Sequence, residues 1–446
     1  MSQIPGPQGV RNNLYALRGL VSEPCSAVDT ITAEHGPTFQ VRLGPLRIVI
    51  LGDPEHTNDL LNNPNEFFRW GRLTKTLTFI VGKTSILASD GADHKRRRGM
   101  VQPGFAKRKL DAWMPLVVSE ADRHIDELLA QSNPSEPVAA DLYAVSRTVI
   151  RRVVTRVLFG ADVSDRADDI GELFEPAMEY AALPMARQLP HPFPNTKRAN
   201  TRNSRKQVDA ILDEVIAIRR ATPDHDGSNL IDALLRATDG SEPLTDAEIR
   251  DQMMTLIAAG YDTTSATLSW AFDHALRTPG VWPRLREEAQ QHLDDALTQC
   301  RTDALPYATA VIRESLRLRP AGVFAPREVR RDITVGPYAI RKGSLISYSP
   351  YVMGRNPQCW DDVLTFNPER FLNNDHDHLM GTAWLPFGRG PRSCIGFALA
   401  QMELILTLSR FAQRLDITLV NARSPLPHGV VVSRPQGGIP SHLALA

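Results

Sequence analysis

The feature that most constrains how this chain can fold is residues 385–396, which read LPFGRGPRSCIG. Three glycines and one proline in so short a stretch predict a backbone held in tight turns, because glycine adopts positive φ without steric cost. The residues that follow, 397–415, carry apolar side chains at helical spacing, which predicts that Cys394 lies at a helix N-terminus. The helix dipole and free N–H groups there favour a thiolate, which can bind a metal or act as a nucleophile.

A lone cysteine is most often a small buried apolar residue, so the residues around Cys394 must decide its role. Their spacing, F-G-x-G-x-R-x-C-x-G, resembles the haem-binding loop of the cytochrome P-450 family, the haem-thiolate monooxygenases. The resemblance implies heme b (iron protoporphyrin IX) as cofactor, with the thiolate of Cys394 as the axial ligand of the iron. It also implies that Arg392 meets a haem propionate, that Phe387 packs near the sulfur, and that the cofactor is contacted by Gly388 and Gly396.

Composition agrees with an ordinary globular protein. Of the 446 residues, 42% are hydrophobic and 23% charged, and no linker-like stretch divides the chain, so we expect one domain over residues 1–446. The formal net charge of zero argues against nucleic acid as the main partner. The four cysteines form no CxxC pair, which makes zinc and disulfide readings weak.

The N-terminus lacks the basic patch and apolar core of a signal peptide, and no stretch approaches the ~20 apolar residues of a membrane span. We therefore expect a cytoplasmic protein of the soluble bacterial type, without a membrane anchor and without a fused reductase. We also expect a monomer.

A basic segment, residues 90–105, reads DGADHKRRRGMVQPGF. His94 and Arg98 are four residues apart and so share one helix face. Most charge runs are solvated helix faces. The pattern G-x-x-H-x-x-x-R, however, resembles the family helix whose histidine and arginine grip the haem propionates. The intervening Lys95, Arg96 and Arg97 would then form a positive docking face for an acidic electron donor.

The longest predicted helix begins at a capping box, Thr245 to Glu248, and ends at Pro279-Gly280. About 32 residues at 1.5 Å rise span roughly 48 Å, enough to cross the molecule. Its middle, AAGYDTTSAT at residues 258–267, forms helix poorly, because Gly260 costs about 1 kcal/mol and the hydroxyls compete for backbone hydrogen bonds. We predict a local bulge and a function there.

Packing of small polar residues is the alternative explanation for this weak helix segment. A-G-x-D-T-T nevertheless resembles the oxygen-activation motif of the same family. The resemblance implies that Ala259 and Gly260 let the cofactor and dioxygen approach the helix. It further implies that Thr263 hydrogen-bonds the oxygen and that Asp262 helps to relay protons, which is general acid catalysis.

A third motif is E-x-x-R, with Glu314 and Arg317 on one helix face, followed by P-E-R-F at residues 368–371. Such pairs are usually surface ion pairs of little worth. The family instead implies a buried network of Glu314, Arg317 and Arg370 that braces the cysteine loop, and it assigns a further propionate contact to Arg327.

Candidate pocket residues come from two apolar segments of the chain. Residues 66–93 are too apolar for a surface loop without a function, and the equivalent loop of the family lies over the distal side of the haem. Residues 323–325 precede a small meander predicted at residues 333–350. We expect a proline-stiffened lid at residues 183–196 and a C-terminal hairpin near residues 430–438 whose tip reaches substrate. The predicted pocket residues are Phe79, Ile86, Leu87, Val323 and Phe324.

The resemblance implies a mainly α fold with small β-sheets, triangular and prism-like, with haem between the long central helix and the cysteine-loop helix. The β-rich parts are expected at about residues 30–70, where residues 38–51 read as a hairpin, and at about 330–350. The implied reaction hydroxylates or epoxidises a hydrophobic small molecule, such as a terpenoid, steroid, fatty acid or polyketide. It uses O2 and two electrons from a separate ferredoxin and its NAD(P)H-dependent reductase.

Three alternatives stay open. A peroxygenase or isomerase on the same fold would need no electron donor, but such relatives usually lack the pair that Asp262 and Thr263 supply. A haem-binding sensor would use Cys394 without needing that relay. A structural protein without haem would explain none of the three motifs.

Overall fold

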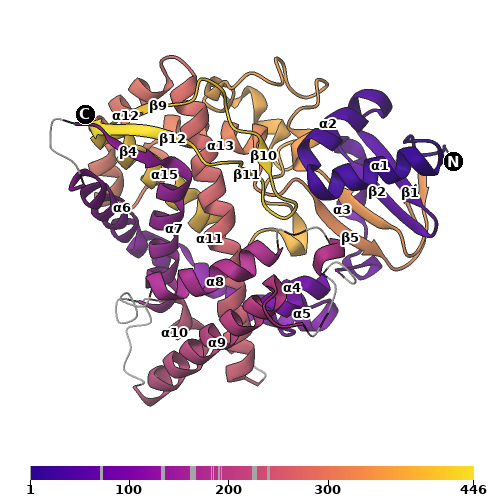
Figure 1. The fold of residues 1–446 in the computed structure, drawn as a ribbon, viewed down its shortest axis with the longest axis horizontal. Coiled ribbons are helices and arrows are strands. Elements are labelled where there is room, and N and C mark those ends of the chain that lie inside the picture. Colours follow the sequence, from indigo (N-terminus) through magenta and orange to yellow (C-terminus); the bar gives the residue numbers. More distant parts are fainter. Residues whose placement is uncertain are drawn as a thin grey trace.

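The computed structural model describes residues 2–70, 74–131, 136–160, 167–181, 183, 185–188, 191, 193–222, 229–238 and 242–446. Figure 1 shows a mostly helical molecule in which α11 (Asp246–Arg277) runs through the middle and strands gather beside the N-terminal helices. The prediction of a mainly α fold with small sheets is confirmed. Among the described residues, no helix combines the length and apolar character needed to cross a membrane.

The other α-helices are α1 (Gly9–Ser22), α2 (Pro24–His35), α3 (Pro54–Asn62), α4 (Thr74–Val81), α5 (Gly91–Val101), α6 (Lys107–Leu129), α7 (Leu142–Phe159), α8 (Ala167–Ala181), α9 (Lys197–Ala221), α10 (Leu230–Arg236), α12 (Val281–Thr298), α13 (Pro306–Leu318), α14 (Pro350–Met353) and α15 (Phe397–Arg414). Several of them pack around α11, whereas α1, α2 and α3 lie beside the largest sheet. The α15 helix follows the cysteine loop, as its apolar spacing predicts.

The largest sheet joins the two predicted β-rich segments. Its strand order is β1 (Thr38–Leu43), β2 (Leu46–Leu51), β8 (Leu345–Tyr348), β5 (Ala325–Val329) and β3 (Phe68–Arg69). The hairpin predicted at residues 38–51 is confirmed, since β1 and β2 pair antiparallel with Leu43 opposite Leu46.

The predicted meander at residues 333–350 is wrong in one respect. Its first two strands, β6 (Ile333–Val335) and β7 (Tyr338–Ile340), form a hairpin of their own, whereas β8 leaves them and lies between β2 and β5. Ile346 is fully buried on β8, and pairing with both neighbours shields it from water. The remaining strands are β4 (Val138–Asp141), β12 (Pro440–Leu445) and β9 (Leu415–Leu419) in one sheet and β10 (Pro427–His428) with β11 (Arg434–Pro435) in another.

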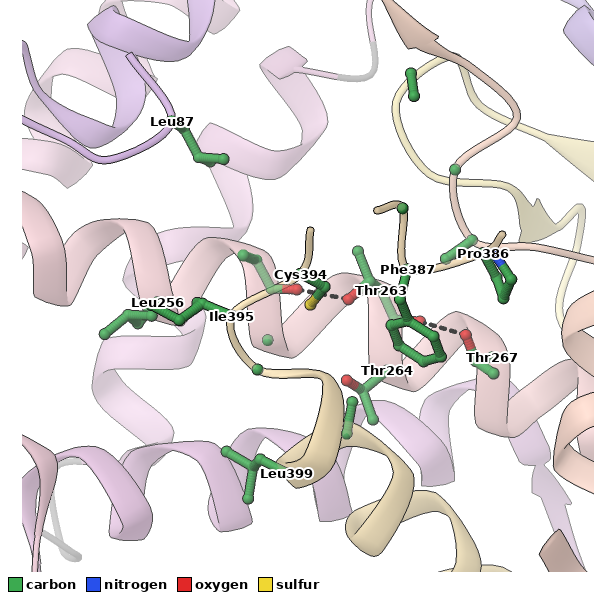
Figure 2. Close-up of a pocket in the computed structure, with 18 of the residues that line it drawn as sticks. Leu87, Leu256, Thr263, Thr264, Thr267, Pro386, Phe387, Cys394, Ile395 and Leu399 are labelled. Atoms are coloured by element: carbon green, nitrogen blue, oxygen red, sulfur yellow. Dashed lines mark hydrogen bonds between the residues drawn. The ribbon is translucent and has the colours of Figure 1, made fainter. Parts of the chain in front are cut away.

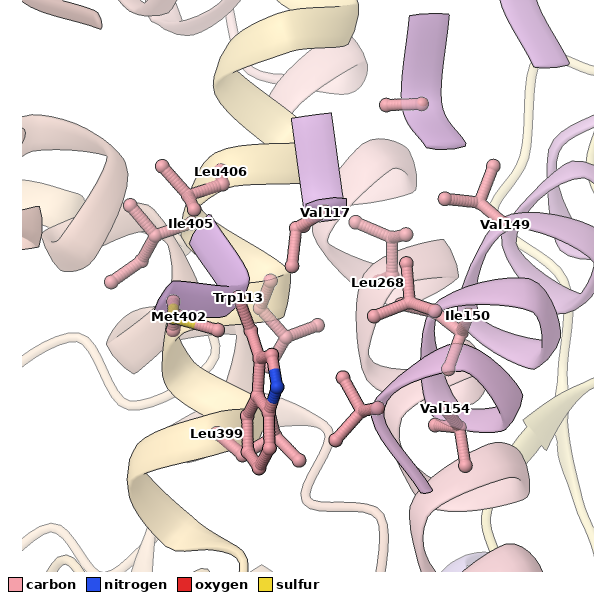
Figure 3. Close-up of a cluster of buried hydrophobic side chains, with 14 of the residues drawn as sticks. Trp113, Val117, Val149, Ile150, Val154, Leu268, Leu399, Met402, Ile405 and Leu406 are labelled. Atoms are coloured by element: carbon pink, nitrogen blue, oxygen red, sulfur yellow. The ribbon is translucent and has the colours of Figure 1, made fainter. Parts of the chain in front are cut away.

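The core lies where α6, α7, α11 and α15 meet, and Figure 3 shows aliphatic side chains from all four helices pointing toward one another. Val117, Val149 and Leu268 are fully buried there. Burying one such side chain contributes about 1.5–3 kcal/mol. This packing fixes α11 relative to α15, and the two helices together bound the candidate site.

The capping box at the start of α11 is present, with Thr245 accepting from the Glu248 N–H and the Glu248 carboxylate accepting from the Thr245 N–H. The predicted bulge is wrong, because α11 is continuous from Asp246 to Arg277. The hydroxyls bond to carbonyls of the helix without breaking it. Each donates to the carbonyl one turn earlier: Thr263 to Ala259 at 2.6 Å and Thr267 to Thr263 at 2.8 Å.

The carboxylate of Glu314 and the guanidinium of Arg317 form a bidentate pair at 2.7 and 2.8 Å, with both side chains fully buried. The Arg370 Nε atom lies 3.4 Å from the same carboxylate. Arg317 also donates to the carbonyl of Gly354, and a Cβ at that glycine would stand 2.3 Å from the carbonyl oxygen of Arg317. Glycine is therefore the residue that fits there, and this contact gives Gly354 a structural role.

A series of aromatic rings connects this network to the cysteine loop. Arg317 lies over Trp360, with 5.4 Å to the ring centroid, and Trp360 packs against Phe371 at 5.8 Å. Phe371 contacts Trp384, which contacts Phe387, each at 6.2 Å. Aromatic pairs at such distances add about 0.5–1.5 kcal/mol beyond area burial. The ion pair and the loop are thus parts of one packed unit.

We expect Arg317→Met to lower the free energy of unfolding by about 3–5 kcal/mol, because it leaves the buried carboxylate of Glu314 without its main partner. Urea unfolding followed by tryptophan fluorescence measures the change. The matched control is Arg220→Ala, which removes an exposed pair with Asp246 and should cost under about 1 kcal/mol. Equal losses in the two variants would contradict a special role for the buried pair.

Candidate functional site

A cavity of about 360 Å³ lies between α11 on one side and the cysteine loop with α15 on the other. Figure 2 shows the contributing side chains, with Thr263, Thr264 and Thr267 on α11 and Cys394 on the loop. Strands β5 and β8 supply Arg327 and Tyr348. A concave site of this size with mostly apolar walls is typical of pockets that hold a cofactor or small molecule.

Cys394 is held by its backbone, whose N–H donates to the carbonyl of Phe387 at 2.8 Å. Its side chain is exposed, but to the cavity. The structure corrects the expected pKa: burial raises the pKa of the Cys394 thiol, and the N–H of Gly396 and the charge of Arg98 only partly oppose this. The helix begins at Phe397, beyond the cysteine, so its dipole acts from further away than predicted. A coordinated metal would still deprotonate the thiol.

The tight turns predicted for the loop are present. Gly388 has a φ of +69°, and a Cβ there would lie 2.8 Å from the hydroxyl of Tyr348. Gly390 also has a positive φ, of +77°. Only glycine adopts such backbone angles without strain, so the loop is a shaped wall of the cavity.

Arginine side chains converge on one end of the cavity. Arg327 is 7% exposed, and among the described residues its Nε has no hydrogen-bond partner. The pKa of Arg392 is lowered to about 10, chiefly by burial and also by the charges of Arg327 and Arg98, while Asp90 opposes the shift. Buried cations without enough counter-charge are costly. The cluster therefore suits an anionic group, and the two propionates of haem have that charge.

Of the four residues predicted to contact the propionates, two line the cavity and two do not. Arg327 and Arg392 line the cavity, although Arg392 donates within the protein to Asp90 at 2.7 Å. Arg98 donates to the carbonyl of Ser393 at 2.8 Å, directly before the cysteine. His94 is buried nearby, and its pKa falls to about 4 through burial and the charges of Arg392 and Arg98. His94 and Arg98 are absent from the cavity wall, so their contact with a cofactor stays a prediction.

The docking face proposed at residues 95–97 stays a prediction, and its two arginines also have a partner within the protein. Arg96 and Arg97 both donate to the carboxylate of Glu248, at 2.9 and 3.1 Å. Arg97 also donates to the hydroxyl of Ser89 at 3.0 Å. These contacts join α5 to the start of α11, and the single carboxylate of Glu248 offsets part of the positive charge of the two arginines.

Asp262 and Thr263 are neighbours in sequence but face different spaces. Thr263 lines the main cavity, whereas Asp262 lines a second, polar cavity of about 330 Å³. The Asp262 carboxylate accepts from Arg434 at 2.5 and 3.2 Å. Burial raises the pKa of Asp262, and Arg434 opposes the rise. Asp262 and Thr263 thus lie on the part of α11 that separates the two cavities.

Of the predicted pocket residues, Leu87 and Phe324 line the main cavity, as do Ala259, Gly260, Phe387 and Gly396. Three others do not. Phe79 packs against Tyr180 at 5.6 Å, and Ile86 and Val323 are buried within hydrophobic clusters. Their apolar character, which marked them as pocket residues, is used for packing. Pro184, Pro190 and Pro192 of the predicted lid lie outside the described residues.

Trp70, Tyr348 and Glu403 also line the cavity, although none of them was among the predicted site residues. Arg392 lies over the ring of Trp70, with 5.2 Å to its centroid. Glu403 is 1% exposed, and its Oε1 has no hydrogen-bond partner among the described residues. A carboxylate on the apolar face of α15 was a signal for Glu403. No local pattern marks Trp70 or Tyr348.

Glu403 predicts a pH effect on stability. Burial raises its pKa from 4.5 to about 8, so the folded state binds a proton that the unfolded state has lost. The stabilisation is complete below about pH 4.5 and disappears as the pH rises through 8, at about 1.4 kcal/mol per unit of pKa shift. Glu403→Gln should abolish this slope in denaturant unfolding measured between pH 5 and 8. Parallel curves for the variant and the parent protein would contradict the assignment.

Comparisons with known proteins identify the family. The family model described as Cytochrome P450 matches residues 5–439. A protein named cytochrome P450 139 from Mycobacterium tuberculosis is 32% identical over 394 residues, which cover 85% of this chain and 90% of the relative. The Cyclooctat-9-en-7-ol 5-monooxygenase of Streptomyces melanosporofaciens is 30% identical, over 85% and 82% of the two chains.

A solved structure shares the fold. The structure described as retinoic acid bound cyanobacterial CYP120A1 superposes with a TM-score of 0.82, at 25% identity, over 93% of each chain. Sequence and structure agree across nearly the whole length. The chain belongs to the cytochrome P450 family, and it is a monooxygenase whose cofactor is haem with cysteine thiolate ligation.

Proposed function

We propose that this enzyme hydroxylates or epoxidises an uncharged, hydrocarbon-rich small molecule, with a terpenoid or steroid preferred over a fatty acyl chain or polyketide. The observation that carries the proposal is that Cys394 and Thr263 line the same cavity. Apart from Arg327, Arg392 and Glu403, the described side chains on its wall are uncharged. The name of the Streptomyces relative, a Cyclooctat-9-en-7-ol 5-monooxygenase, supports a cyclic hydrocarbon substrate.

Cys394 would hold the haem iron through its thiolate, and Arg327 and Arg392, assisted by Arg98 and His94, would bind the propionates. The orphaned Nε of Arg327 and the exposure of the sulfur to the cavity support this assignment. When bound, haem supplies the activation of O2, by which one oxygen atom enters a C–H or C=C bond and the other leaves as water. The net reaction consumes two electrons and two protons, and we place the electron source in a separate ferredoxin and its NAD(P)H-dependent reductase.

Residues of the chain would relay the protons from solvent. At rest, the Thr263 hydroxyl donates to the carbonyl of Ala259 at 2.6 Å, and rotation about one bond would turn it toward a ligand in the cavity. Asp262 stands on the adjoining helix face with access to the polar cavity. Together they would pass protons from solvent to the reacting oxygen, which is general acid catalysis. Without that supply, reduced oxygen would leave as peroxide.

We expect Cys394→Ser to abolish the red-displaced absorption of the carbon monoxide complex, because a serine hydroxyl is a poor substitute for a thiolate. The measurement is the reduced difference spectrum of purified protein. Cys359→Ser is the matched control, since Cys359 is half-buried away from the cavity and should keep the spectrum. Retention of the band in Cys394→Ser would exclude this residue as the iron ligand.

We expect Thr263→Ala to reduce product formed per NAD(P)H by about 10²-fold and to raise peroxide release, because proton transfer loses a positioned group. Assays with surrogate redox partners and a terpenoid and steroid library measure both quantities. Thr267→Ala is the control, because Thr267 also lines the cavity and donates to a carbonyl one turn earlier. The same loss in both variants would contradict a specific role for Thr263.

The same assays test the proposed reaction as a whole. Product formation that depends on NAD(P)H, O2 and redox partners is the expected result. Equal turnover driven by peroxide alone would instead indicate a peroxygenase.

A further inference from the structure

Helix α15 turns one stripe of its surface toward the main cavity. Leu399 and Ala400 line the cavity, and Glu403 and Leu404 follow one turn later. These residues continue the wall that begins at Cys394, so Glu403 lies on the same side of the cavity as the proposed iron ligand. Among the described residues, the tip of the C-terminal hairpin, which was predicted to reach substrate, is absent from the cavity wall.

A carboxyl group stands out in this apolar stripe. Glu403 is 1% exposed, and its Oε1 has no hydrogen-bond partner among the described residues. A buried polar group without a partner costs about 1–3 kcal/mol. An apolar side chain at this position would line the same stripe without that cost, which indicates that the carboxyl group has a role beyond packing.

No charged side chain compensates Glu403. Burial alone raises its pKa to about 8, so the arginines of the same cavity do not act on it. The other charged or titratable groups on the cavity wall are Arg327, Tyr348, Arg392 and Cys394. Charged groups on the elements that pack against α15 have other partners: Asp122 pairs with Arg410 and Arg414, Asp126 with Arg414, Arg286 with Asp416, Glu314 with Arg317, Asp273 with Arg277, and Asp303 with Arg301.

A negative charge on Glu403 would act strongly on a cofactor in this cavity. In an apolar interior, two charges interact several times more strongly than they do in water. Reduction of ferric haem adds one negative charge to the same space. A carboxylate at Glu403 therefore opposes reduction, and a neutral carboxylic acid does not.

We propose that Glu403 couples reduction of the haem iron to the uptake of one proton. The carboxylate takes this proton from water, while one electron from an external donor converts Fe(III) to Fe(II), so the net charge of the buried site stays the same. The coupling is reciprocal, since a proton on Glu403 makes the iron easier to reduce and an electron on the iron raises the affinity of Glu403 for a proton. The proposal depends on the haem cofactor and is independent of which substrate the enzyme oxidises.

The test is a spectroelectrochemical titration of the purified haem protein, which measures the reduction potential of the iron against pH. Glu403 is neutral below its pKa of about 8 and charged above it, so the potential of the parent protein should fall as the pH rises. We expect the equilibrium constant for reduction to fall about fivefold between about pH 7 and pH 9, as for a modest coupling between sites. At about 59 mV per factor of ten for one electron, this is about 40 mV.

Glu403→Gln should keep the potential that the parent protein has at neutral pH and lose the dependence on pH, because glutamine has the shape of the neutral acid. Glu288→Gln is the matched control. Burial also raises the pKa of Glu288, but its carboxylate accepts from the N–H groups of Tyr307 and Ala308 and lies outside the cavity wall. Equal pH dependence in Glu403→Gln and the parent protein, or its loss in both variants, would overturn the coupling.

A second measurement uses the parent protein alone and decides the question even if Glu403→Gln fails to fold. Isotope labelling of the glutamate side chains separates their infrared bands from those of aspartate and of the haem propionates. At a pH just above 8, where the carboxylate predominates in the ferric protein, reduction by dithionite should produce the band of a protonated glutamic acid. Reduction without this band would overturn the coupling while leaving the proposed monooxygenase function intact, because that function is tested by product formation.

Discussion

The ion pair between Glu314 and Arg317 is the interaction on which the site depends. Both side chains are fully buried, and two charges withdrawn from water repay their desolvation only with nearly ideal geometry. Arg317 meets that condition by using all five of its N–H donors. They go to Glu314 twice and to the carbonyls of Gly354, Val363 and Thr365. Directional bonds to two other chain segments, at Gly354 and at residues 363–365, fix the position of residues that precede the cysteine loop, which apolar packing alone would leave less specific.

Helix α11 acts as a partition. Thr263 lines the main cavity on one side of the helix, and Asp262 lines the polar cavity on the other. The partition is stable because a capping box starts it, aliphatic packing against α6, α7 and α15 holds it, and its hydroxyls are satisfied by its own carbonyls. Two residues adjacent in sequence therefore line two separate spaces.

Short-range patterns in the sequence predicted much of this structure. The glycine turns around Cys394, the capping box at Thr245 and the hairpin at residues 38–51 each depend on a few adjacent residues, and each is present. Pairings across long sequence separations were beyond the same reasoning. No pattern in the neighbouring sequence marks the salt bridge of Asp262 with Arg434 or that of Glu248 with Arg96.

The remaining errors have separate physical causes. The predicted bulge in α11 overestimated competition from hydroxyls, which here bond to carbonyls of a helix that stays continuous. Ile86 and Val323 were expected in the pocket because an apolar side chain serves a core and a ligand equally well. The pKa of Cys394 depends on burial that only the folded chain defines.

The self-satisfied hydroxyls of α11 have one more consequence. The hydroxyls of Thr263 and Thr267 are hydrogen-bonded to carbonyls of their own helix. The α11 side of the cavity therefore contacts a ligand mainly through its shape and less through hydrogen bonds. In the proposed reaction, the carbon that is oxidised would depend on the shape of apolar wall residues such as Leu87 and Phe324. Single apolar replacements at such positions give natural selection a route to new products from an unchanged reaction centre.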